Sequence, residues 1–224
     1  MAKRRGKGTS QVQQNLPLDR GWGGRREGAG RKRLPKGRRR VPHVSRERLR
    51  RNQPVHVTWR VADHVWNLRS QRGFRTLLRA FVPAAHRFGM RITHFSVQGN
   101  HVHLLVEVGG RASLYRALRG LGVRMAKGLN RLMGTRGAVF ADRYHIHPLA
   151  TPREARNAIH YVLGNHAVHA GRRGEQVARD DPFAVGPTLN QGPGALWRKL
   201  VGDDPPVAPP QSWLLTEGWR RARA

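Results

Sequence analysis

The sequence contains no cysteine, which excludes a disulfide framework, a thiol nucleophile and a thiolate metal site. Any metal ion would have to bind histidine, carboxylate or amide side chains. Long apolar runs are also missing, and the N-terminus lacks the apolar stretch of a secretory signal. These absences predict a cytoplasmic protein with no membrane-spanning segment.

Acidic residues are scarce, since 13 Asp and Glu stand against 43 Lys and Arg, for a formal net charge of +30. A charge of this size attracts polyanions at long range, so nucleic acid is the leading candidate partner and an anionic membrane surface the second. Aromatic residues make up only 7% of the chain. We therefore expect nucleic acid to be held mainly by electrostatic attraction, with binding that weakens steeply as salt is added.

The 224 residues fit one domain of ordinary size with extensions at both ends. Residues 1–52 are rich in Arg, Lys, Gly and Pro and poor in large apolar side chains, which predicts a mostly disordered basic arm that binds DNA. A flexible basic linker is the alternative for such a low-complexity run. Its candidate DNA-binding residues include Arg31, Lys32 and Arg33.

Residues 53–170 show the hydrophobic periods of regular secondary structure, whereas residues 171–224 read as an irregular C-terminal extension with tryptophans available to dock on the core. The periods predict strand, helix, strand, strand, helix, strand, helix. The first helix is expected to end near Gly89, and the last to begin with Thr151 as N-cap and Pro152 in its first turn. This order predicts an α+β, ferredoxin-like split βαβ fold, with an antiparallel sheet and helices packed mainly on one face.

The helix predicted from about Ala112 to Met133 has two contrasting faces, one of leucines and one of cations. The apolar face suits packing on the sheet. The basic face lacks acidic partners one turn away, so it suits phosphates better than internal ion pairs, although a solvated basic face is the common alternative. Its candidate DNA-binding residues are Arg116, Arg119, Arg124, Lys127 and Arg131.

Two histidines, His101 and His103, open the predicted third strand directly after Gly99 and Asn100. Because side chains alternate along a strand, both imidazoles point to the same face and can converge on one ion. A His-x-His pair is a weak signal alone, since the chain has 12 histidines and short motifs recur by chance. Its place at the start of a strand expected in the centre of the sheet favours a metal site.

Tyr161 and Asn165 stand one turn apart on the last predicted helix, so their side chains project from the same face. If that face meets the histidines, the amide oxygen of Asn165 completes a ligand set suited to Mg²⁺ or Mn²⁺. Tyr161 would then be placed to attack a phosphodiester held on the ion and form a covalent phosphotyrosine.

Plainer interpretations of these residues stay open. A tyrosine beside an apolar helix stripe often packs into the core, and an asparagine near a helix end often serves as a cap. Two other tyrosines, Tyr115 and Tyr144, compete as nucleophile. Tyr144 follows Asp142 and precedes a histidine that could activate it, whereas Tyr115 lacks an amide one turn later.

Three runs together resemble the single-tyrosine HUH transposases, in particular REP-associated tyrosine transposases and related insertion-sequence transposases. They are residues 99–106 (Gly-Asn-His-Val-His-Leu-Leu-Val), residues 140–145 (Phe-Ala-Asp-Arg-Tyr-His) and residues 161–165 (Tyr-Val-Leu-Gly-Asn). The resemblance covers about residues 53–170. Related proteins often continue the tyrosine motif with proline and arginine, whereas His166 follows here, so details of DNA contact are expected to differ at this point.

The resemblance implies that His101 and His103 are the metal-binding pair, Asn165 the third ligand and Tyr161 the nucleophile. It further implies Mg²⁺ or Mn²⁺ as cofactor and single-stranded or hairpin DNA as substrate. Cleavage would leave a 5′-phosphotyrosine and a free 3′-hydroxyl that later reverses the reaction. The protein would be bacterial and lie on the nucleoid when bound to DNA.

A second interpretation is a non-catalytic module that binds DNA or structured RNA on the same scaffold, with structural histidines. Formation of a metal-dependent covalent adduct separates the two. The sequence leaves open whether the protein is a monomer or a homodimer, and whether it serves a mobile element or a resident role.

Overall fold

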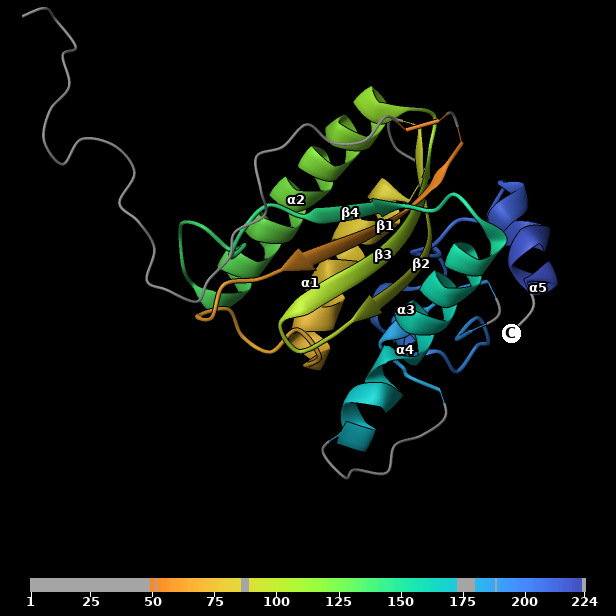
Figure 1. Ribbon diagram of the computed structural model, residues 1–224. Helices are drawn as coiled ribbons and strands as arrows, with labels where there is room; N and C mark the ends of the chain where they lie inside the picture. The colour runs from red at the N-terminus through yellow and green to blue at the C-terminus, as the bar shows by residue number, and fades with distance from the viewer. Residues whose placement is uncertain (1–48, 51, 86–88, 173–179, 188, 223–224) are drawn as a thin grey trace, which may run out of the picture. The chain divides into compact units, whose positions relative to one another are not determined.

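The structure is a computed structural model, and its described residues belong to one compact unit, Arg40–Ala224 (Figure 1). The predicted DNA-binding residues Arg31, Lys32 and Arg33 lie outside the described part. The three regions inferred from composition stay a prediction. The structure describes residues 49–50, 52–85, 89–172, 180–187 and 189–222.

Five strands form one antiparallel sheet in the order β4-β1-β3-β2-β5 (Figure 1). The central strand β3 pairs along its length with β1 on one side and β2 on the other. The predicted α+β class and the split βαβ order are confirmed. The strands are β1 (Pro54–Arg60), β2 (Met90–Val97), β3 (His101–Val108), β4 (His145–Pro148) and β5 (Ala184–Val185).

Three long helices accompany the sheet, and no helix in the described part of the chain is long and apolar enough to cross a membrane. The first helix was predicted to reach about Gly89, but it ends at Phe81. Pro83 has no N–H to donate, and the chain continues as the 3₁₀ turn η1 (Val82–Ala84). The helices are α1 (Gln71–Phe81), α2 (Arg111–Met133), α3 (Pro152–Arg172), α4 (Leu196–Val201) and α5 (Trp219–Arg221), with a π-helical turn η2 (Leu214–Gly218) before α5.

Helices α1 and α2 pack side by side on one face of the sheet and enclose the main core (Figure 1). Alternate β3 residues such as Val102 and Leu104 face this core, together with the predicted apolar stripe of α2. A Cβ on Gly122 of α2 would lie 2.3 Å from the ring of Trp59. The absence of a side chain there therefore lets α2 approach the sheet closely.

Helix α3 lies across β2 and β3 on the opposite face, so the sheet is covered from both sides (Figure 1). A second, smaller core joins Leu105 of β3 to Ile159 and Val162 of α3 and to Leu215 of the C-terminal segment. The odd-numbered residues of β3 point to this face. The two predicted histidines are therefore on the α3 side.

A capping box fixes the start of α3. The hydroxyl of Thr151 accepts a hydrogen bond from the backbone N–H of Glu154, and the Glu154 carboxylate accepts from the N–H groups of Ala150 and Thr151. These bonds, first of all that from Ala150, hold the pKa of Glu154 below its usual range. The predicted N-cap and the proline in the first turn are confirmed, and they set where the α3 side chains fall over the sheet.

The C-terminal segment adds to both the sheet and the core. Strand β5 pairs with β2, and Trp197 is fully buried, whereas Trp213 remains half exposed. Asp181 forms a bidentate ion pair with Arg69, at 2.8 and 2.9 Å. The buried carboxylate of Glu107 accepts hydrogen bonds from the backbone of this segment. These contacts attach the segment to the sheet.

Candidate active site

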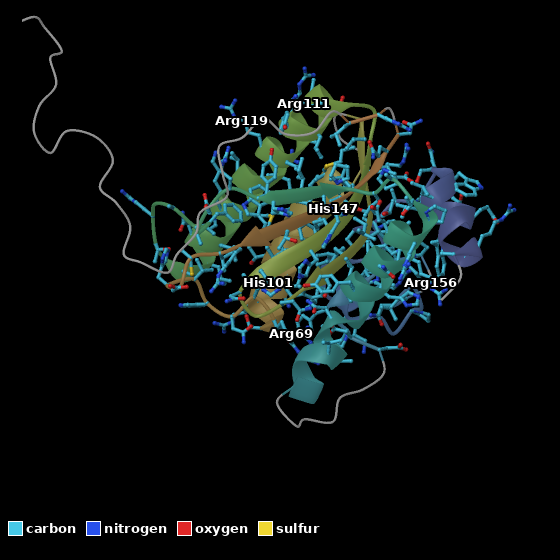
Figure 2. The ribbon with its side chains drawn as sticks, in the orientation of Figure 1. Arg69, His101, Arg111, Arg119, His147 and Arg156 are labelled. Atoms are coloured by element: carbon cyan, nitrogen blue, oxygen red, sulfur yellow. The ribbon has the colours of Figure 1, made fainter. Side chains whose placement is uncertain are left out.

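Two imidazoles lie together at the start of β3, on the face that α3 covers. The ring centroids of His101 and His103 are 4.7 Å apart, and the rings are nearly perpendicular. His103 is 2% exposed, while His101 is less buried and nearer the strand end (Figure 2). The alternation of the strand therefore brings both side chains to one place.

Neighbouring side chains hold the Nδ1 atom of each ring. His101 Nδ1 lies 2.8 Å from Asn100 Oδ1. His103 Nδ1 lies 3.2 Å from both Thr58 Oγ1 and His56 Nε2, which come from the adjacent strand β1. Such contacts orient an imidazole and leave Nε2 as the atom directed toward a ligand.

Tyr161 projects from α3 onto His103 of this pair. Its ring lies edge-on to His103, with centroids 5.1 Å apart and an interplanar angle of 81°, and its centroid is 5.8 Å from that of His56. The side chain is 48% exposed, so solvent or a substrate can reach it. The structure thus brings the predicted nucleophile against one of the predicted metal ligands.

Asn165 lies one turn further along α3 and is only 2% exposed. Its amide nitrogen is buried and has no hydrogen-bond partner among the described residues, which is rare for a buried polar atom. Turning the amide about its terminal bond exchanges nitrogen and oxygen, so Asn165 can offer an oxygen to a cation or an N–H to a phosphate.

These residues fit a hard or borderline divalent cation. Two imidazoles with fixed Nδ1 atoms and one buried amide provide three donors of the type that Mn²⁺ or Mg²⁺ accepts. Within the described residues there is no group of three or more His, Cys, Asp or Glu arranged to hold a metal. Amide oxygens are another ligand type for these ions, and Asn165 is the amide predicted for this role.

His56 was not identified from the sequence, although it belongs to the site. Its pKa is lowered from 6.5 to about 4, mainly by burial and to a smaller extent by the nearby His147 and His145. His56 is therefore uncharged at neutral pH. The sequence did contain one signal, because His56 and Thr58 alternate with valines in β1 and so share a face, but nothing local indicated which strand that face would meet.

The competing tyrosines lie elsewhere. Tyr144 packs against Trp59, with ring centroids 5.1 Å apart, on the side of the main core. Tyr115 lies on α2, with the guanidinium carbon of Arg111 5.5 Å from its ring centroid. Their positions favour Tyr161 as the tyrosine of the histidine site.

The predicted DNA-binding cations of α2 lie on the helix layer opposite the histidine site. Figure 2 shows Arg111 and Arg119 on α2, well apart from His101. A neighbouring group of arginines on α1 was not predicted from the sequence, because the apolar period of this helix indicated only its buried face. The helices α1 and α2 contain no acidic residue, and their predicted and additional cations are Arg72, Arg75, Arg79, Arg111, Arg116, Arg119, Arg124, Lys127 and Arg131.

A scan against models of known protein families finds no match, and no curated protein matches the sequence. Several solved structures are similar to this chain, and two of them are described here. One is a REP-associated tyrosine transposase bound to a REP hairpin, with 14% identity, a TM-score of 0.48 and coverage of 58% of this chain and 74% of that one. The other, from Deinococcus radiodurans R1, is designated a "putative transposase", with 14% identity, a TM-score of 0.38 and coverage of 65% of this chain and 100% of that one.

The family that the sequence motifs resemble is thus represented among the structural neighbours. The likeness is one of fold at low identity. The assignment of chemistry to this chain depends on its own residues.

Proposed function

We propose that this protein is a metal-dependent DNA endonuclease and transposase, which cleaves and rejoins single-stranded DNA through a 5′-phosphotyrosine. The observation that carries the proposal is the contact between Tyr161 and His103. An exposed phenol lies 5.1 Å, centroid to centroid, from a buried imidazole whose Nδ1 is already held by β1.

In the proposed reaction the hydroxyl oxygen of Tyr161 attacks the phosphorus of a phosphodiester. A bond forms between the phenolic oxygen and phosphorus while the bond from phosphorus to the 3′-oxygen breaks. The phenol loses its proton and the departing 3′-oxygen gains one. The reverse reaction rejoins a strand and regenerates the tyrosine.

His101, His103 and Asn165 are the residues proposed to hold Mg²⁺ or Mn²⁺. The ion, when bound, would stabilise negative charge that develops on the phosphoryl oxygens. The part played by the chain itself is to orient the two imidazoles through their Nδ1 atoms and to place Tyr161 beside His103 on a capped helix.

The cations of α2 are proposed to hold the DNA backbone. They lie on the other side of the sheet from Tyr161, so binding and chemistry occupy different surfaces of the described unit. A structured substrate such as a hairpin, with its stem on one surface and a single strand on the other, suits this separation. The predicted contribution of Arg31, Lys32 and Arg33 belongs to the arm outside the described residues.

The test is incubation of the full chain with labelled single-stranded hairpin DNA from the flanks of its gene, with Mn²⁺ or Mg²⁺, followed by a denaturing gel. We expect a covalent adduct that requires metal, disappears in Tyr161→Phe and persists in the matched control Tyr144→Phe. An adduct that survives Tyr161→Phe would refute the placement of the nucleophile. Tight binding without any adduct would favour the non-catalytic nucleic-acid-binding module.

A further inference from the structure

We infer that His56 is a positioning residue of this site, whose Nε2 accepts a hydrogen bond from Nδ1–H of His103 and fixes the tautomer in which His103 presents Nε2 to a cation. The inference deepens the proposed function and rests on it for the identity of the ligand. The contact between the two imidazoles stands independently of it.

The geometry comes from the pairing of β1 with β3. Thr58 is directly opposite His103 in the register, and His56 stands opposite Leu105, so both β1 side chains share the face of His103. His56 Nε2 lies 3.2 Å from His103 Nδ1, and the ring centroids are 5.3 Å apart. A nitrogen-to-nitrogen distance of this length allows one hydrogen bond, with one ring as donor.

The direction of that hydrogen bond decides what His103 can do. If His103 donates from Nδ1, its Nε2 carries a lone pair and can bind a cation. If His56 donates instead, a neutral His103 holds its proton on Nε2 and cannot bind a metal through that atom. The hydroxyl of Thr58, also 3.2 Å from Nδ1, accepts together with His56 in the first arrangement and can donate to Nδ1 in the second, so it is compatible with both.

The position of His56 suits it to orient the His103 ring rather than to bind an ion directly. Nε2 of His56 lies against Nδ1 of His103, and an orienting partner of a metal-binding histidine contacts the ring nitrogen that does not bind the metal. The same ring also lies beside Tyr161. Loss of such an orienting partner typically weakens metal binding about 10- to 100-fold.

The experiment compares the full-length parent with His56→Leu, which removes the acceptor, and with His56→Gln, which keeps one. His64→Gln serves as the matched control, because His64 is an exposed histidine in the turn after β1, outside the site. Two measurements are made at fixed pH 7.5. Long-range ¹H–¹⁵N NMR without metal reports the tautomer of His103, and electron paramagnetic resonance titration gives the affinity for Mn²⁺.

We expect His103 of the parent to be the Nδ1–H tautomer. His56→Leu should lose this preference and weaken Mn²⁺ binding about 10- to 100-fold. His56→Gln should recover most of the tautomer preference and of the affinity, and His64→Gln should change neither. Circular dichroism of each variant reports folding. Should His56→Leu not fold, the parent spectrum and the Gln variant still decide the question.

An Nε2–H tautomer in the parent, or a folded His56→Leu variant with parental Mn²⁺ affinity, would overturn the positioning role. A different set of results would mark failure of the proposed function alone. In that case His103 of the parent is the Nδ1–H tautomer and His56→Leu changes the tautomer, yet the parent binds no Mn²⁺ and forms no adduct with DNA.

Discussion

His94 should make the stability of this protein depend on pH. The side chain lies on β2, is 4% exposed, and has its Nδ1 3.0 Å from Thr93 Oγ1. Burial lowers its pKa from the ordinary 6.5 to about 4. The charged groups that line the hollow beside it, Glu217 and Arg220, are more than half exposed, opposite in sign and 3.9 Å apart, so their effects on His94 largely cancel.

The size and the sign of this pH effect on stability follow from the linkage between proton binding and unfolding. The pKa in the folded protein lies below that in the unfolded chain, so the unfolded chain binds the proton more readily as pH falls. The contribution to stability is therefore complete above pH 6.5 and is lost as pH falls from 6.5 toward 4. At about 1.4 kcal/mol per pKa unit, the full loss is about 3 kcal/mol, of which about 2 kcal/mol is already lost at pH 5.

The assay is urea unfolding of the parent and of His94→Gln at pH 7.5 and pH 5.0. We expect the parent to lose about 2 kcal/mol more than the variant between the two pH values. Self-repulsion of the cationic chain and titration of the other histidines are common to both proteins and cancel in this comparison. His160→Gln, at an exposed position on α3, should behave like the parent, and equal losses in the parent and His94→Gln would refute the reasoning.

Three further outcomes are expected. Gly122→Ala should lower the free energy of unfolding in urea by about 1–3 kcal/mol, because the new methyl group meets a buried indole ring. Gly164→Ala, with open space around it, should be neutral or stabilising, and equal effects of the two substitutions would contradict the close approach of α2 to the sheet. Asp181→Ala should lower stability by about 3 kcal/mol or more, because it leaves a largely buried arginine without its partner, and a change in melting temperature near zero would contradict this. Removing both Arg119 and Lys127 should reduce the slope of log affinity against log salt by about 0.7 for each phosphate of single-stranded DNA that these cations neutralise, and an unchanged slope would exclude them from the binding surface.

Local patterns in the sequence were enough to predict much of the fold. The apolar period of α2 identified its buried stripe, and the Thr-Pro-x-Glu pattern located the start of α3, because both depend on residues within one or two helical turns. The end of α1 was predicted too late. The apolar spacing continued beyond Pro83, but the missing proline N–H ended the α-helix first.

The contribution of the C-terminal segment was predicted only in part. Its composition indicated an irregular chain whose tryptophans could dock on the core, and Trp197 does fill the main core, but nothing indicated that a short strand would pair with β2. The signal was weak because β5 contains only two residues, too few to show a period. Its place is set by contacts with residues far away in the sequence, such as the ion pair of Asp181 with Arg69.

The sequence by itself determined which residues share a face: His101 with His103 on a strand, and Tyr161 with Asn165 on a helix. These relations follow from the two-residue period of strands and the 3.6-residue period of helices. Only the tertiary structure decided which faces meet. His56 contacts His103 across 47 residues of sequence, and the cations of α2 lie on the layer opposite Tyr161, because strand register and helix layering depend on long-range packing that no local period encodes.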